Sequence, residues 1–429
     1  MPMLLAAQPH GFDGWLLPLL GPWLGEGAAL AVAMLATLLL LLAFISVNVM
    51  FLVWAERKVS ARIQNRMGPM MTGPRRLAET SMWLGGGLQT LVDAFKLLFK
   101  EPIIPARADR LPFYLAPISI FTVCLAAHVV LPFGPLFYVS DLNIGLLYTV
   151  AISSLTVLSI LMAGWSSNSK YSLLGGLRSA AQMLSYEIPM IFALLGPVLM
   201  AGSLSMVDIV KAQAELGVWF FIPSLLGLVI YYICGIAEVN RPPFDIPEAE
   251  SELVAGYVSE YSGMMFAMFF LAEFANMFLV SGIAATVFLG GWLVPFWNPP
   301  ELAQPGSVEQ PRLWVQLLGV AMFALKTYFL VAIMMWIRWT FPRVRPDHLM
   351  NFGWKFLLPM AFLNLMGCAL AMLAHQMVPT PWPIVGVGLL TLGVGAGIMR
   401  AVRDPVPLQK GGAPGTPPPL QKAPKGVNP

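Results

Sequence analysis

The chain has 429 residues, of which 58% are hydrophobic and 11% charged, and its formal net charge is +3. Such a composition excludes a water-soluble protein. The three cysteines, Cys124, Cys234 and Cys368, lie far apart in different apolar runs, which excludes a metal site or an iron–sulfur cluster built from them within one chain.

Apolar runs of 18 to 27 residues follow one another along the chain. They predict an all-α, polytopic transmembrane helical bundle. About nine spans are expected, at residues 28–54, 113–133, 144–164, 180–202, 219–240, 263–289, 313–337, 355–375 and 384–400. Residues 1–27 are expected to form an N-terminal periplasmic or interfacial segment, 28–403 the transmembrane domain, and the proline-rich residues 404–429 a disordered tail.

The basic residues predict the orientation. All but three of the 25 Lys and Arg lie in the loops 55–112, 165–179, 241–262 and 338–355 or after residue 399. Because basic loops stay on the cytoplasmic side of a membrane, the N-terminus is expected in the periplasm and the C-terminus in the cytoplasm. The lipid bilayer of a bacterial inner membrane is the expected surrounding.

The first long loop, 55–112, is expected to contain amphipathic interfacial helices. Lys58, Arg62 and Arg66 recur every four residues and form a basic face close to the lipid headgroups. Residues 88–100 place apolar side chains on one helical face and polar ones on the other. A plain surface helix and a side entrance for an amphipathic, lipid-like ligand both remain open.

Acidic residues gather after the fifth predicted span. Seven of the 22 acids fall within one short stretch: Glu238, Asp245, Glu248, Glu250, Glu252, Glu260 and Glu273. Residues 245–248 have the form of a capping box and predict a helix running towards Gly256. Carboxylates favour helix N-termini, but neighbouring carboxylates repel, so several of them need a proton or a partner. Coupled carboxylates of this kind could pass protons along.

Three charged residues lie well inside predicted spans. Glu187 is seven residues into its span and close to Pro189, which removes a backbone donor. Glu273 and Lys326 lie ten and thirteen residues into theirs. Because a charge at a bilayer centre costs roughly 2.5–3.5 kcal/mol, these residues predict a polar interior in which Glu273 and Lys326 could pair or exchange protons. A carboxyl held for packing, and a pair that only stabilises packing, are the alternatives.

Motifs for bound redox groups are absent from the sequence. The chain has no Walker loop, no dinucleotide fingerprint after a strand and no CxxC pair, and its four His give no credible metal site. No bound metal, haem, flavin or iron–sulfur cluster is therefore expected in this chain, and any electrons must come from elsewhere.

Five stretches resemble one family. AERKVSARIQNRMGP (55–69), KLLFKEPIIP (96–105), QMLSYEIPM (182–190), EVNRPPFDIPEAESELVAGYVSEYSGMMFAMFFLAEFANM (238–277) and FPRVRPDHLMNFGWKFLLP (341–359) are similar to the NuoH-type membrane subunits of the proton-pumping NADH:quinone oxidoreductase, respiratory complex I. The resemblance covers about residues 28–375. The chain departs from the family pattern at residues 68–70 and 345–348, where two loop contacts are placed in doubt.

The resemblance implies a membrane subunit that forms the quinone chamber and tunnel at the junction with the peripheral arm. It implies coupling of quinone reduction to proton translocation, in an enzyme complex whose redox centres lie in other subunits. A quinone, ubiquinone or similar, would be the substrate. The implied partners are iron–sulfur and quinone-site subunits of the peripheral arm and small and antiporter-like membrane subunits; nucleic acid is not a partner.

Site residues follow from matching positions. The proton relay implied by the family, with Lys326 added from its place in a span, comprises Glu187, Glu238, Glu248, Glu250, Glu252, Glu260, Glu273, Asp93 and Lys326. The quinone chamber and its entrance are expected to comprise Glu56, Arg57, Arg66, Tyr186 and Asp245.

Two other functions remain open at this stage. A related membrane subunit of a membrane-bound hydrogenase or formate hydrogenlyase would share the acidic connection without needing quinone. A stand-alone proton-coupled transporter would be expected to show inverted internal repeats, which are not apparent in the sequence.

Overall fold

The structure, a computed structural model, describes residues 26–70, 72, 85–246, 253–295, 297, 299–303, 312–378, 380 and 382–402. Within these ranges every regular element is a helix, which confirms the predicted all-α class. Residues 1–25 and the proline-rich tail lie outside the described residues. So do three predicted relay residues, Glu248, Glu250 and Glu252.

The described part contains seven helical stretches long and apolar enough to cross a membrane. They are α2 (Glu26–Ile63), α5 (Arg110–His128), α6 (Gly145–Ser166), α7 (Lys170–Ala201), α11 (Gly263–Val287), α13 (Leu313–Thr340) and the run Pro346–Met377, which joins α14 (Pro346–Phe352), η3 (Gly353–Leu357) and α15 (Leu358–Met377). Two further apolar helices are α9 (Leu225–Glu238) and α16 (Trp382–Val402). Each of the nine predicted spans overlaps one of these helices.

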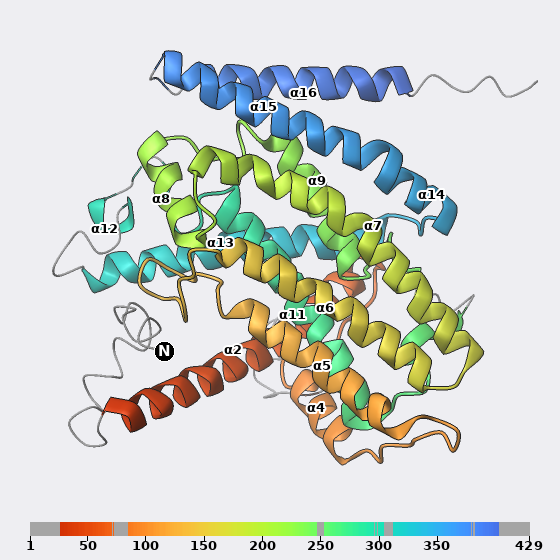
Figure 1. Cartoon of the computed structure of the whole chain (residues 1–429). Coiled ribbons are helices and arrows are strands. Elements are labelled where there is room, and N and C mark those ends of the chain that lie inside the picture. The colour runs from red at the N-terminus through yellow and green to blue at the C-terminus, as the bar shows by residue number, and fades with distance from the viewer. Residues whose placement is uncertain are drawn as a thin grey trace, which may run out of the picture.

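Helix α7 lies at the centre of the bundle. It packs against α6 on one side and against α9 and α15 on the other (Figure 1). Helix α16 is the outermost helix and lies along α15, whereas α2 and α4 (Gln89–Phe99) lie on the opposite side. Small residues such as Gly164 and Gly176 let α6 and α7 approach closely.

Short helices connect the spans. Helix α4 coincides with the predicted amphipathic segment and leaves Val92, Phe95 and Leu98 exposed. Hydropathy does not predict α8 (Met206–Leu216). Ser205 caps its N-terminus, and the Ser205 hydroxyl accepts a hydrogen bond from the Asp208 N–H. The remaining short elements are η2 (Gly256–Val258) and α12 (Pro300–Ala303).

Helix α9 is shorter than its predicted span. It has 14 residues and begins after Ser224, where the Asn364 side chain of α15 accepts hydrogen bonds from the Gly227 N–H and the Ser224 hydroxyl. It ends at Glu238, because Asn240 adopts a left-handed conformation with φ of 53°. The chain then leaves helical geometry inside the bundle, which places Glu238 at a helix end.

The segment after α9 is held against α7 by one buried amide. The Gln182 Nε2 atom donates to the carbonyls of Ala237 at 2.8 Å and Phe244 at 2.6 Å. Further on, the Tyr261 ring stacks on Phe113 of α5, with centroids 4.2 Å apart. The helix predicted from Asp245 falls largely on residues 247–252, outside the described residues; Asp245 itself is not helical.

Candidate functional site

Arg241 is the centre of a buried ion network. Its side chain is 3% exposed; Nη1 lies 2.8 Å from Glu56 Oε2 on α2, and Nε lies 2.5 Å from Glu273 Oε1 on α11. The guanidinium carbon also lies 4.2 Å from the centroid of the Phe274 ring. A planar guanidinium suits this place, because its N–H donors form a rigid fork that can serve two carboxylates. Arg241 thus ties the segment after α9 to two spans.

Two further arginines complete the network. Arg338, in the last turn of α13, pairs with the other carboxylate oxygen of Glu56. Arg343, just after α13, pairs with Asp245 at 3.0 Å. Because Asp245 also lies close enough to Glu273 to repel it, the six charges form one group. Three carboxylates meet three guanidiniums, so the network is formally neutral.

Glu187 and Glu238 form a second site, beside α6. The Ser154 hydroxyl donates to Glu187 Oε1, and the hydroxyl of the neighbouring Ser153, which donates to the Val150 carbonyl at 2.9 Å, lies near the Glu238 carboxyl. Both carboxyl side chains are half-buried, and they repel one another electrostatically. Helices α7 and α9 therefore bring two predicted relay residues together on one pair of adjacent serines.

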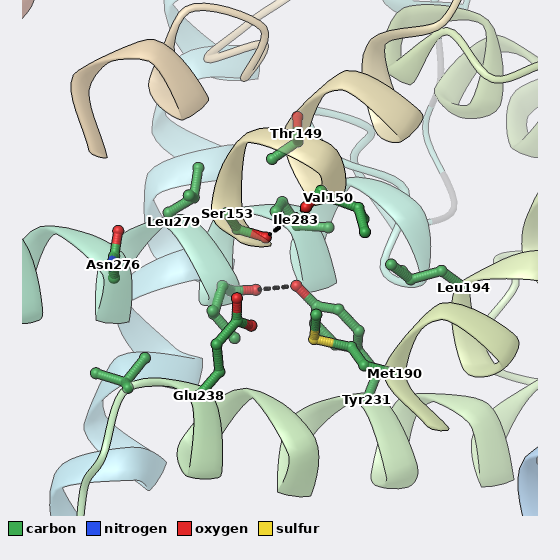
Figure 2. Close-up of a pocket in the computed structure, with 12 residues that line it drawn as sticks. Thr149, Val150, Ser153, Met190, Leu194, Tyr231, Glu238, Asn276, Leu279 and Ile283 are labelled. Carbon is green, nitrogen blue, oxygen red and sulfur yellow. Dashed lines mark hydrogen bonds between the residues drawn. The ribbon is translucent and has the colours of Figure 1, made fainter. Parts of the chain in front are cut away.

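A small cavity adjoins Glu238. Its volume of about 20 Å³ is enough for one water molecule. Figure 2 shows Glu238 pointing towards Ser153, with the Tyr231 hydroxyl donating to the Val280 carbonyl beside it. The rest of the lining is mostly apolar, from Val150, Met190, Leu194, Leu279 and Ile283.

The first loop contributes a third group of predicted residues. Arg57 of α2 pairs with Asp93 of α4 at 2.6 Å, and Gln89 donates to the other oxygen of Asp93 at 2.9 Å. Arg66 is exposed and, with Lys58 and Arg62, lines a small basic pocket at the end of α2. The structure thus joins Arg57 to Asp93, and α2 to the amphipathic helix.

Tyr186 and the segment beside Glu260 have structural partners. The buried Tyr186 hydroxyl donates to the Leu349 carbonyl of α14 at 3.0 Å. Glu260 is half-buried, next to Tyr261. Burial raises the pKa of Tyr261 to about 12, although hydrogen bonds from Ser166 and Ser167 act in the opposite direction, so this phenol remains neutral at physiological pH.

Lys326 contacts backbone carbonyls. Its Nζ atom donates to the carbonyl oxygens of Leu289 at 2.7 Å, Gly291 at 2.9 Å and Leu293 at 2.7 Å. The same atom lies 4.2 Å from the centroid of the Trp219 ring. Glu273, its predicted partner, pairs with Arg241 instead. Lys326 thus holds the turn after α11; its role in a relay stays a prediction.

Substitution of Lys326 separates these two roles. Lys326→Met leaves three buried carbonyls without their donor, so we expect a loss of about 2–4 kcal/mol. Lys326→Gln keeps two N–H donors and should keep most of this stability. Thermal inactivation of the purified complex measures both effects. A stable Lys326→Gln variant that no longer pumps protons would favour the relay role.

Several residues of these sites were not among the predicted ones. Arg338 and Arg343 looked like loop charges that only set orientation, and Arg241 like a lone base in an acidic stretch. Ser153 and Ser154 looked like small polar residues in an apolar span, and their adjacency was the available signal. Among the described residues, no group of three or more His, Cys, Asp or Glu could hold a metal ion.

Comparisons with known proteins show the family of this chain. A family model described as NADH dehydrogenase matches residues 36–369. The chain is 44% identical over 381 residues to the NuoH subunit of the NADH-quinone oxidoreductase of Anaeromyxobacter dehalogenans, covering 87% of this chain and 90% of that protein. It belongs to the NuoH family. The resemblance predicted from its motifs is thereby confirmed.

Other members of the NuoH family match similarly. The protein of the same name from Rhodospirillum centenum is 47% identical over 341 residues, which cover 80% of this chain and 94% of the relative. Subunit 8 of the NADH-quinone oxidoreductase of Rhodothermus marinus is 45% identical over 339 residues, which cover 77% of this chain and 96% of the relative. The family match includes every site residue described above and ends before α16.

Proposed function

We propose that this chain is the membrane subunit of an NADH-quinone oxidoreductase and forms the quinone chamber and tunnel at the junction with the peripheral arm. It would couple quinone reduction to proton translocation through its carboxyl groups. Other subunits of the complex would be its partners and would supply the electrons. The proposal includes an inner-membrane location with the N-terminus in the periplasm and the C-terminus in the cytoplasm.

The buried network around Arg241 is the observation that carries the proposal. The side chains of Arg241 and Glu56 are 3% and 7% exposed, whereas Arg338 and Arg343 reach the surface. Removing charges from water is costly unless they are paired and hydrogen-bonded, and a helix bundle could be held together by apolar contacts alone. The network joins α2, α11 and α13 to the acidic segment after α9. Such an arrangement supports a role in which charge changes in one part of the protein act on another.

Quinone reduction supplies the charge change. A quinone that accepts two electrons must take up two protons to become a neutral quinol. Negative charge that develops near the network would alter the proton affinity of its carboxyl groups, because Coulomb interactions are strong in a low-dielectric interior. When one carboxyl takes up a proton, its arginine loses a partner and the network gains a positive charge, which would favour ionisation of the next carboxyl. Protons could advance stepwise in this way.

The test uses the complete complex from its host membrane. Affinity purification of this chain should bring down NADH-oxidising subunits; recovery of hydrogenase subunits, or of the chain alone, would contradict the proposal. In the purified complex, Glu187→Gln should lower NADH:quinone reduction and proton pumping about 100-fold or more, within the range for loss of a proton-transfer group. NADH oxidation by ferricyanide should be unchanged.

Glu215→Gln is the matched control. Glu215 lies on α8 and is exposed, so its replacement removes a carboxylate without touching either site. It should leave quinone reduction and pumping at wild-type levels. Equal effects of Glu187→Gln and Glu215→Gln would count against the relay.

A further inference from the structure

Ser153 and Ser154 compete for one backbone acceptor. Their hydroxyl oxygens lie 2.9 Å and 3.0 Å from the carbonyl oxygen of Val150. The Ser154 hydroxyl also donates to Glu187, and the Ser153 hydroxyl lies close enough to Glu238 to stabilise its carboxylate. A serine hydroxyl has a single hydrogen to donate. Each serine can therefore donate to Val150 or to its carboxylate, but not to both at once.

The Val150 carbonyl has limited capacity. Residue 150 lies inside α6, so its oxygen also accepts the regular helical hydrogen bond from the N–H four residues later. A carbonyl oxygen has two lone pairs, which leaves one for the two serines. Only one serine can turn fully towards Val150, and the other is then directed to its carboxylate.

This competition couples the protonation states of the two acids. An ionised carboxylate accepts the serine hydrogen, whereas a protonated carboxyl donates to the serine oxygen and turns that serine's hydrogen to Val150. If both acids are protonated, two hydroxyls compete for one lone pair. If both are ionised, Glu187 and Glu238 repel one another. The state with one proton avoids both costs.

We propose that Ser153, Ser154 and the Val150 carbonyl hold Glu187 and Glu238 as a unit that carries one shared proton. The inference rests on the proposed function, because it specifies how two relay carboxyls act together. When the proton leaves one carboxyl oxygen and reaches the other, the two hydroxyls exchange acceptors and the pair keeps a net charge of −1. The cavity beside Glu238 has room for one water, which could hydrogen-bond this end of the pair.

The residues that line the cavity offer Glu238 no compensating cation. The lining side chains beside Glu238 are apolar, or neutral and polar such as Thr149 and Asn276. The other titratable neighbours of Glu238 are Tyr231 and Cys234, and the Tyr231 hydroxyl is already committed to Val280. The negative charge of Glu238 can thus be stabilised by a hydrogen bond from a serine hydroxyl or removed by protonation.

The serines are positioning residues, and their test uses the complete complex. Ser153→Ala and Ser154→Ala should each lower NADH:quinone turnover about three- to tenfold, with NADH:ferricyanide activity unchanged. The double variant should be little worse than the worse single variant, because groups that act as one unit are not additive. Ser153→Thr and Ser154→Thr should each keep at least half of the wild-type NADH:quinone turnover. Threonine keeps a hydroxyl that can hydrogen-bond to the carbonyl three or four residues before it.

An infrared readout separates hydrogen bonding from packing. In the redox-induced difference spectrum, the band of the protonated carboxyl should shift in both alanine variants and return in the threonine variants. Ser159→Ala is the control, because Ser159 lies on the same helix and its hydroxyl accepts from Ser119 at 2.8 Å. Its spectrum should match that of the wild type. An alanine variant that fails to assemble is replaced by its threonine counterpart, whose band must stay at the wild-type position.

The outcomes distinguish the inference from the proposed function. Wild-type coupling in both Glu187→Gln and Glu238→Gln would overturn the proposed function. If those variants lose coupling while both alanine variants keep turnover, pumping and the carboxyl band, only the serine inference is overturned. Equal impairment of the alanine and threonine variants would also overturn it, because the hydroxyl would then not be the cause.

Discussion

Replacing Arg241 by Met is expected to lower NADH:quinone reduction by a factor of about 100 or more and to destabilise the complex. Arg241 serves Glu56 and Glu273 at once. Removing one partner from a buried ion pair costs about 3–5 kcal/mol, because the remaining charge stays in a low-dielectric place. Glu56 keeps Arg338, so the larger loss falls on Glu273.

A second substitution identifies the unpaired charge as the cause. In Arg241→Met with Glu273→Gln, one positive and one negative charge are removed, and the double variant should be more stable than Arg241→Met alone. A double-mutant cycle of thermal inactivation midpoints measures this coupling. Arg241→Lys should be intermediate, because an ammonium is a point charge that cannot present a planar fork to two carboxylates.

Arg110→Met is the matched control for the loss of an arginine. Arg110 is exposed at the first residue of α5, so its replacement should leave activity and stability near wild type. Retention of more than half the quinone reductase activity in Arg241→Met would show that the network is not required for coupling. Additive effects in the double-mutant cycle would show that Arg241 and Glu273 act independently.

The positions of the helices could be predicted from the sequence because hydropathy is a local property. Runs of apolar residues gave nine spans, whose ends differ from those of the helices by up to ten residues, and a period of 3.6 residues gave α4 to within one residue at each end. The shortness of α9 was not predictable in this way. It depends on the Asn364 side chain at one end and the left-handed Asn240 at the other, and the first of these comes from a helix 137 residues away.

The importance of individual charges could be predicted, but not their partners. Glu56 and Arg241 are 185 residues apart, and nothing in a single sequence shows which helices are neighbours. Depth within a span made Glu273 and Lys326 appear to be partners. The depth of a residue in a span does not show on which side of the helix its side chain lies. In the structure, Lys326 contacts the turn after α11 and Glu273 contacts Arg241.

Close approach of two backbones is likewise invisible in the sequence. Gly175 of α7 faces η2: a Cβ atom at this position would lie 2.6 Å from Gly256 Cα and 2.8 Å from Tyr257 N. Both neighbours are main-chain atoms, which cannot move aside as a flexible side chain can. The Ser172 hydroxyl, one turn earlier, donates to the Tyr257 carbonyl at 3.2 Å and holds the same contact.

Gly175→Ala should therefore push η2 away from α7. Overpacking commonly lowers the free energy of unfolding by about 1–3 kcal/mol. A clash with main-chain atoms belongs at the upper end of that range, because the main chain cannot move aside as a side chain can. The displaced segment contains Glu260 and leads directly into α11, which carries Glu273. We expect a loss of about 3 kcal/mol in stability and a several-fold fall in NADH:quinone reduction. NADH:ferricyanide activity should be retained.

Gly393→Ala provides the control for adding one methyl group to a membrane helix. Nothing lies within 4 Å of a Cβ atom at Gly393 of α16, and alanine is favoured over glycine inside a helix by roughly 0.5–1 kcal/mol. This variant should be as stable as the wild type or slightly more stable. If Gly175→Ala and Gly393→Ala show the same inactivation midpoint and turnover, then η2 is free to move without consequence. The tight contact between α7 and η2 would then not be what positions the acidic segment.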